Sequence, residues 1–281
     1  MSQDYNHDIL YHYTDFQALD GILRQAQLRL NNILNMNDAA EMRHFMSGLC
    51  NAIVKKLEAD KDLEQVRNVR ELFREELKKE FFYSAYAACF SLYRDDAAQW
   101  ERYGNRGRGV CIAFRGGLLQ QMVEGALSLQ TVFYQDDMTE HNLVNVLYDL
   151  IINTRVLSDD VPEIQKVLND AWICSAAFKH PSFASEKEVR LVVSPFEREY
   201  FDVEPCYHIT TERIKKYYPL DLRSMCKRVE ASMEDLVTEI IIGPESTQSE
   251  SILQDYLRDN GLQELAERVS LSDCPLRKSS V

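Results

Sequence analysis

Two glutamates near residue 187 have a spacing that suits chemistry on a sugar. Glu186 and Glu188 precede the apolar run Val189–Val193, which is interrupted by Arg190. Residues two positions apart point to the same face of a strand, so we expect both carboxylates on one face. Such a pair can stabilise the positive charge that develops on a sugar during glycosidic cleavage. The alternative is an exposed strand start at which both carboxylates are solvated.

A histidine between two tyrosines forms a second cluster near the start of the chain. His12 lies in Tyr11-His12-Tyr13-Thr14, at the end of a predicted strand and just before a predicted helix. We expect its ring nitrogen to reach a ribose hydroxyl, while the Tyr13 backbone bonds a carboxamide. The alternative is a partly buried histidine that is hydrogen-bonded by the backbone.

A third cluster supplies aromatic rings. Ser91 ends the apolar stretch before it, Tyr93 follows, and Trp100 and Tyr103 come a few residues later. Trp100 and Tyr103 are three positions apart and therefore share one face of a short helix. Their rings suit a flat heteroaromatic ligand such as nicotinamide. The alternative is that both rings pack in the core.

Guanidinium groups follow directly, at Arg102, Arg106 and Arg108. Guanidinium matches the geometry of phosphate, so these arginines can contact a phosphate group. The alternative is a solvated turn.

Several familiar kinds of site are excluded by their motifs. The chain has no G-x-G-x-x-G, no G-x-x-x-x-G-K-[ST], no H-E-x-x-H and no G-x-S-x-G. Its 7 cysteines form no C-x-x-C pair, and an odd count without metal spacing argues against both a disulfide framework and a zinc site. We therefore expect no metal cofactor.

The order of the three clusters, histidine then aromatic then glutamate, resembles the His-Tyr-Glu branch of the ADP-ribosyltransferase superfamily. More closely, the chain resembles a large uncharacterised bacterial family that is distantly similar to those enzymes. The closer resemblance spans nearly the whole chain and depends on these motifs: HYT, CFS-x8-W-x2-Y, GVCIAF, FKHPSFASEKEVRLVV and IIIGP.

The resemblance implies a role for each predicted site residue. It implies that His12 holds an NAD ribose hydroxyl and that Thr14 follows as in the family's His-Gly-Thr turn, with Tyr13 in place of the glycine. Glu188 would match the catalytic glutamate, which bonds the nicotinamide-ribose 2′-hydroxyl, and Glu186 the upstream acid that orients the acceptor. The remaining NAD contacts are expected from Ser91, Tyr93, Trp100, Tyr103 and Arg190.

Hydrophobic periodicity predicts the elements that carry these residues. Strands are expected at 9–13, 28–30, 82–91, 110–114, 189–193, 201–203, 206–209, 237–242 and 269–271. Helices are expected from Asp15, from residue 37 or 38, and over 59–80, 95–103, 117–127, 140–178 and 249–260. We predict one α+β domain over residues 1–281, with a mostly antiparallel split-sheet core and helical insertions at about 37–80 and 140–178.

Composition indicates the expected compartment and binding partners of the protein. The net charge is -13, so the overall field would repel nucleic acid unless a local basic stretch overrides it. No run approaches the roughly 18 to 20 apolar residues of a membrane span, and no secretory signal is visible at the N-terminus. We expect a cytoplasmic protein that does not bind membranes.

The sequence therefore predicts an NAD-dependent ADP-ribosyltransferase with NAD as co-substrate and a protein or nucleic acid as acceptor. The resemblance further implies a toxin or anti-phage effector with a partner or antitoxin protein. The alternatives are an NAD glycohydrolase on the same scaffold and a non-catalytic interaction or sensing module.

Overall fold

The fold is built on a mostly antiparallel sheet. The computed structural model describes residue 5 and residues 8–35, 41–80, 83, 85–135, 138, 141–154, 162–193 and 203–275. Within them, one path of hydrogen-bonded strands runs, in spatial order, β12 (Val269–Leu271), β11 (Val237–Ile242), β4 (Val110–Arg115), β1 (Ile9–Thr14), β3 (Tyr86–Ser91), β2 (Gln27–Asn32), β10 (Ile214–Asp221) and β9 (Cys206–Ile209). Two further strands lie off this path: β8 (Glu188–Val193) pairs with β3, and β5 (Leu127–Thr131) pairs with β8.

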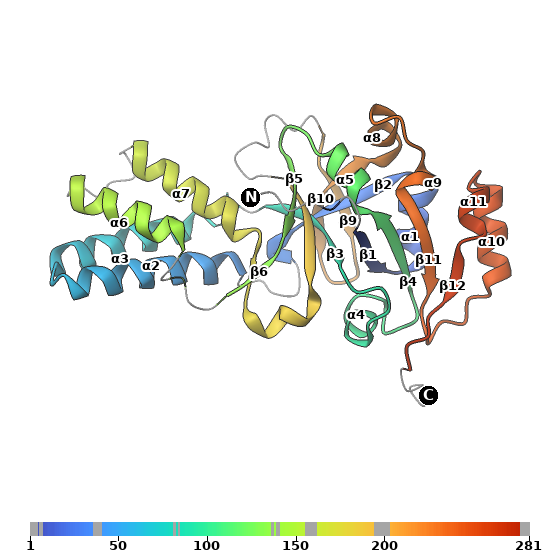
Figure 1. Cartoon of the computed structure of the whole chain (residues 1–281), viewed down its shortest axis with the longest axis horizontal. Helices are drawn as coiled ribbons and strands as arrows, with labels where there is room; N and C mark the ends of the chain where they lie inside the picture. Colours follow the sequence, from blue (N-terminus) through green and yellow to red (C-terminus); the bar gives the residue numbers. More distant parts are fainter. Residues whose placement is uncertain are drawn as a thin grey trace.

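Helices lie in three groups around this sheet (Figure 1). At one end, four helices pack together as a bundle: α2 (Glu41–Ala59), α3 (Leu63–Lys78), α6 (Asn142–Thr154) and α7 (Pro162–Ser175). At the other end lie α10 (Glu250–Asp259) and α11 (Gln263–Ala266). Shorter helices connect the strands: α1 (Phe16–Leu23), α4 (Ala97–Arg102), α5 (Gly116–Met122), α8 (Leu222–Arg228), α9 (Met233–Leu236), and the 3-10 helices Ile33–Asn35 and η2 (Pro181–Glu186).

Two large hydrophobic cores hold the elements in place. One lies on the face of the sheet that carries Leu10, Phe90 and Val189. The other fills the helix bundle and includes Ala87 and Val192 from the opposite face of β3 and β8. The two predicted insertions therefore pack on one another, and their core continues onto the sheet. A two-stranded pair, β6 (Phe133–Tyr134) with β7 (Phe178–Lys179), lies beside them.

Local sequence explains how the first strand and its neighbours form. Asp15 begins α1, because its side chain accepts a hydrogen bond from the Ala18 backbone N–H at 2.7 Å. Gly109 precedes β4 at a point where an added Cβ would lie 2.0 Å from the Thr14 carbonyl oxygen. Only glycine permits this close approach of two backbones. The glycine of the GVCIAF motif therefore fixes how β4 meets the end of β1.

Most predicted elements are confirmed, including β1, β3, β4, β8, β11, β12 and the capped helix α1. Four of the described strands, β5, β6, β7 and β10, were not predicted. The region 117–127, predicted as helix, is helical only to Met122, and β5 begins at Leu127. The predicted helix start at 37 or 38 and most of the predicted strand 201–203 lie outside the described residues.

The predicted α+β class with a mostly antiparallel sheet is confirmed, since the described strand pairs are antiparallel apart from β11–β12 and β6–β7. None of the helices in the described part of the chain has the length and apolar composition of a membrane span.

Candidate functional site

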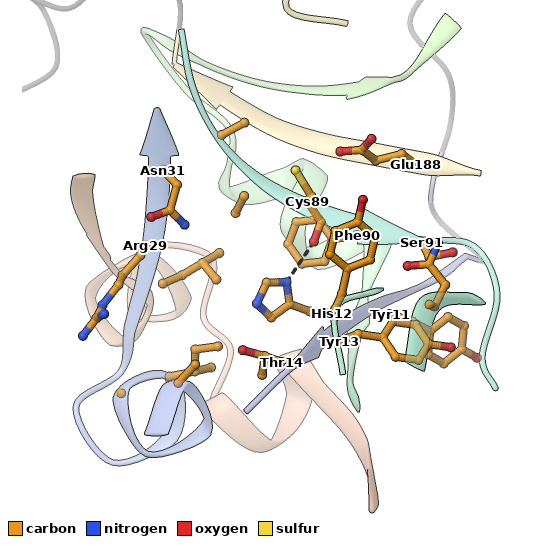
Figure 2. Close-up of a pocket in the computed structure, with 18 of the residues that line it drawn as sticks. Tyr11, His12, Tyr13, Thr14, Arg29, Asn31, Cys89, Phe90, Ser91 and Glu188 are labelled. Carbon is orange, nitrogen blue, oxygen red and sulfur yellow. Dashed lines mark hydrogen bonds between the residues drawn. The ribbon is translucent and has the colours of Figure 1, made fainter. Parts of the chain in front are cut away.

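The strand β3 divides the sheet and creates the candidate site. On one side it pairs with β8 along its whole length, from Tyr86 to Ser91. On the other side it pairs with β2 at Tyr86 and Ala87, and with β1 at Ser91. A cavity of about 360 Å³ runs along the fork between β1 and β2 (Figure 2). Ligand pockets typically measure about 300 to 1,000 Å³, so this cavity can hold much of a small ligand.

His12 occupies the fork. Its Nδ1 lies 2.8 Å from the Cys89 carbonyl oxygen of β3, and its ring packs against Phe90 with 5.7 Å between centroids (Figure 2). Burial lowers the pKa of His12, although the bond to the Cys89 carbonyl opposes that shift. A neutral ring whose Nδ1–H donates to that carbonyl leaves Nε2 as an acceptor. The predicted role, a bond with a ligand hydroxyl, is compatible with this arrangement.

Two glutamates and a lysine form the acidic end of the cavity. Lys179, at the end of β7, donates to Glu186 at 2.6 Å and to Glu188 at 2.8 Å. All three side chains are buried and line the cavity. We call the group Lys179, Glu186 and Glu188, with the partners Arg102, Tyr103 and Arg190, the carboxylate end.

Glu188 is held by two cations. Arg190 donates from Nε to one carboxylate oxygen at 2.8 Å and from Nη2 to the other at 3.2 Å. Burial by itself raises the pKa of Glu188, but the charges of Arg190 and Lys179 outweigh burial and lower that pKa to about 2. Glu188 is therefore ionised at neutral pH. Arg190 also donates to the Ala176 carbonyl at 2.8 Å, which anchors it to the end of α7.

Glu186 is held from the other side. Arg102 donates to it at 2.9 Å and the Tyr103 hydroxyl at 2.8 Å, both on the same oxygen. The pKa of Tyr103 is raised, chiefly by burial, so its hydroxyl stays protonated and donates. Helix α4 thus positions the acid through two successive residues.

The two glutamates converge for a different reason from the one predicted. Only Glu188 lies in a strand; Glu186 ends η2, and Lys187 between them has φ 44°, in the left-handed region. The Ser91 hydroxyl donates to the Glu186 carbonyl at 2.8 Å, and Gln99 donates to it at 3.1 Å. This turn, rather than strand alternation, brings both carboxylates to Lys179.

The structure brings most of the predicted site residues together but leaves three away from the cavity. Those that line it are His12, Tyr13, Thr14, Ser91, Tyr103, Glu186 and Glu188. Trp100 is fully buried, packs edge-on against Tyr13 and donates to Asp95 at 2.5 Å. Arg190 is buried behind Glu188, and the Tyr93 side chain is exposed. Of the two aromatic residues predicted to stack on nicotinamide, Tyr103 therefore lines the cavity and Trp100 does not.

The opposite end of the cavity carries basic side chains that were not predicted from the sequence. Arg29 of β2, His208 of β9, and Lys215 and Lys216 of β10 line it. The predicted arginines are elsewhere: Arg102 pairs with Glu186, and Arg106 and Arg108 are exposed in a turn away from the cavity. The only sequence signal was the alternation in Gln27-Leu28-Arg29-Leu30-Asn31, which indicates a polar face but not a cavity.

The site is thus a ligand-sized cavity in a mixed α/β protein, with buried carboxylates at one end and cations at the other. Among the described residues, no group of three or more His, Cys, Asp or Glu side chains is arranged to hold a metal ion. Such an arrangement suits an organic ligand that has both an anionic part and a part that becomes cationic during reaction.

Comparison with known families gives one match. The chain is similar, over residues 99–191, to the family described as Protein of unknown function (DUF2971). The matched segment runs from α4 to β8, so it contains Tyr103, Glu186 and Glu188 but not His12. This agrees in part with the expected resemblance to an uncharacterised family, since the match does not extend to the HYT, CFS and IIIGP motifs. Comparison with curated proteins and with solved structures gives no significant match.

Proposed function

We propose that the protein cleaves NAD at the bond between nicotinamide and ribose and transfers the ADP-ribose to an acceptor. The observation that carries the proposal is that His12, Tyr103 and Glu188, from three distant parts of the sequence, line one cavity. The fork of the sheet at β3 also supports it, because the resemblance to ADP-ribosyltransferases implies a split sheet around the NAD site.

The proposed role of Glu188 follows from its charge. As the glycosidic bond breaks, positive charge develops on the ribose, and a fixed carboxylate stabilises it through the 2′-hydroxyl. Glu188 is ionised and held from behind by Arg190 and Lys179. A carboxylate that is already oriented needs little rearrangement during the reaction, which favours catalysis.

The remaining residues hold and orient the substrate. The Tyr103 ring provides a flat apolar surface beside Glu186 for nicotinamide, and His12 offers Nε2 to a ribose hydroxyl. The C1′–nitrogen bond breaks, nicotinamide leaves as a neutral amide, and C1′ forms a bond with a nucleophilic atom of the acceptor. That atom releases its proton to solvent, and Glu186, beside Glu188, is placed to orient it.

Water in place of the acceptor would make the protein an NAD glycohydrolase. The chemistry of bond cleavage is the same in both cases, so the same residues serve both reactions. The product distinguishes them: free ADP-ribose indicates hydrolysis, whereas labelled macromolecule indicates transfer.

One observation favours a second candidate, a non-catalytic module that binds a nucleotide. Both oxygens of Glu188 already accept hydrogen bonds, from Lys179 and Arg190. A carboxylate has about four acceptor sites, so a ribose hydroxyl can still be accommodated, but the same pairing would also suit a purely structural role. Binding of NAD with no release of nicotinamide would support this candidate.

The test is nicotinamide release from NAD by the purified full chain and by Glu188→Gln. We expect the variant to lose about 100- to 1,000-fold in rate, the loss typical of removing a group that stabilises a transition state. Glu163→Gln is the matched control, because it makes the same chemical change at an exposed position of α7. Equal rates for the parent and Glu188→Gln would contradict the proposal, provided that thermal melting shows both are folded.

A further inference from the structure

Four cationic or titratable side chains gather at the end of the cavity furthest along the sheet from β8. Arg29, His208, Lys215 and Lys216 all line it, and they come from three adjacent strands. We call these residues the cationic group. We propose that the cationic group binds the phosphate groups of a small dinucleotide, and so fixes the direction in which NAD lies in the cavity; this inference deepens the proposed function and rests on it.

Strand register places three of the four on one face of the sheet. Arg29 pairs with Pro219, and Lys215 pairs with His208. Pro219 and Lys215 are four positions apart on β10, so alternation along the strand gives Arg29, Lys215 and His208 the same face. Asn31, two positions after Arg29, shares this face and pairs with Ala87 of β3. This is also the face on which Ser91 and Glu188 stand opposite each other.

Within the described residues, Arg29, Lys215 and Lys216 have no carboxylate partner. In the portion of the chain that the structure describes, every ion pair at the cavity involves the carboxylate end, and none involves Arg29, Lys215 or Lys216. This is unusual for a chain whose net charge is -13, in which acidic side chains outnumber basic ones. Cations that form no ion pair beside a concave surface attract an anion.

The guanidinium group of Arg29 is also held in position. It lies over the Tyr217 ring at 4.9 Å from the centroid, a contact that fixes the planar group without using its N–H donors. Five donors in a fixed fork match the oxygens of a phosphate. Lys216 packs in a similar way over Tyr218 at 5.7 Å. Both cations therefore remain available to a ligand while their stems are ordered.

The charges at the two ends determine how a dinucleotide would lie. At the carboxylate end the cations Lys179, Arg102 and Arg190 are already paired with Glu186 and Glu188, whereas the cationic group forms no ion pair within the described residues and favours phosphate. The pyrophosphate is therefore expected beside β2 and β10, and the nicotinamide ribose beside β8. This direction brings the scissile bond to Glu188.

The experiment measures binding of ADP-ribose and of inorganic pyrophosphate by calorimetry, with the full chain. The variant is the double substitution Arg29→Gln and Lys215→Gln. The matched control is Arg67→Gln with Lys55→Gln, which removes the same two charges from exposed positions on the helix bundle. We expect the variant to bind ADP-ribose about 10- to 100-fold more weakly, because hydrogen bonds to charged groups are lost. The control should bind like the parent.

Two further measurements separate the outcomes. Nicotinamide, which lacks phosphate, should bind the parent and the variant equally, and Arg29→Lys should lose less affinity for ADP-ribose than Arg29→Gln. Unchanged ADP-ribose binding by the variant, an equal loss in the control, or no ADP-ribose binding by the parent would overturn the proposal. So would a variant that loses affinity for a single-stranded RNA oligonucleotide but not for ADP-ribose.

These measurements also distinguish a failure of the phosphate site from a failure of the proposed function. If the parent releases no nicotinamide from NAD but its ADP-ribose binding depends on Arg29 and Lys215, the phosphate site stands and the catalytic proposal fails. If NAD is cleaved and the double variant binds ADP-ribose normally, the catalytic proposal stands and the phosphate site fails.

Discussion

The two ends of the cavity are built in opposite ways. At the carboxylate end, Lys179, Glu186, Glu188 and Arg190 are buried, and each forms at least one ion pair. At the cationic end, Arg29, Lys215 and Lys216 are half-buried and form no ion pair with any residue that the structure describes, and Arg29 and Lys216 pack over tyrosine rings. Among the described residues, the charges are therefore paired at one end and not at the other.

This difference indicates what each end contributes. Burying an ion pair seldom adds stability compared with apolar side chains of similar size, because both charges lose water. A network of buried pairs therefore makes most sense where a carboxylate must be held in one orientation. Cations without partners cost less in a half-exposed position and leave a field for a ligand. We infer that the carboxylate end positions the reacting groups, and that the cationic group contributes binding affinity.

The largest expected effect is on stability, at the carboxylate end. Arg190→Met should lower the free energy of unfolding by about 3 to 5 kcal/mol, because Glu188 is left buried with one cation fewer. Urea unfolding monitored by circular dichroism measures this. Arg70→Met, which removes an exposed pair with Glu58, should change little. A loss at Arg190 no greater than that at Arg70 would mean that the two ends do not differ as described.

Acid should reveal the same network. The folded-state pKa of Glu188 is about 2 and its ordinary value is 4.5, so the folded state binds the proton less readily than the unfolded state does. The resulting stability is present above pH 4.5 and is lost as the pH falls towards 2, by roughly 3 kcal/mol. Unfolding of Glu188→Gln should lack this part of the pH dependence. Parallel stability curves for the parent and Glu188→Gln between pH 6 and 3 would contradict the expectation.

A smaller effect is expected from one hydroxyl. Tyr103→Phe keeps the ring in the cavity and removes the bond to Glu186, which retains Arg102 and Lys179. Stability should fall by about 1 to 2 kcal/mol, while the KM for NAD changes little because the stacking surface remains. Steady-state kinetics with thermal unfolding would check both. A large rise in KM would show that the hydroxyl contacts the substrate directly.

The smallest expected effect belongs to the cationic end and depends on salt. Raising sodium chloride from 50 to 500 mM should weaken ADP-ribose binding several-fold, because half-exposed charges are screened. Unfolding of the parent should hardly respond to the same change, since the buried pairs are shielded from salt. Binding that is independent of salt would argue that the cationic group does not contact phosphate.

Much of the sheet could be predicted from the sequence, because apolar runs bounded by turn residues identify buried strands. The strand β10 could not: its sequence Ile-Lys-Lys-Tyr-Tyr-Pro-Leu-Asp contains Pro219, which argues against a central strand. In the structure Pro219 pairs with Arg29 of β2. Since Lys215 and Lys216 lie on that strand, missing it also meant missing the cationic group.

The sequence predicts which residue types form the candidate site better than it predicts how they contact one another. The pairing of Glu188 with Arg190 follows from their two-residue spacing on a strand, whereas Lys179 reaches both glutamates only because η2 folds back. Trp100 and Tyr103 share a helix face in sequence, but the length of α4 and the position of Tyr13 decide that Trp100 is buried. Such choices depend on long-range packing, which local spacing does not record.

A crystal structure of Glu188→Gln with NAD bound would test both proposals together. We expect the nicotinamide ribose to lie beside residue 188 and Tyr103, and the pyrophosphate to lie between Arg29 and Lys215. A dinucleotide that lies in the opposite direction, with its phosphates beside Lys179, or that binds outside the fork between β1 and β2, would contradict this expectation.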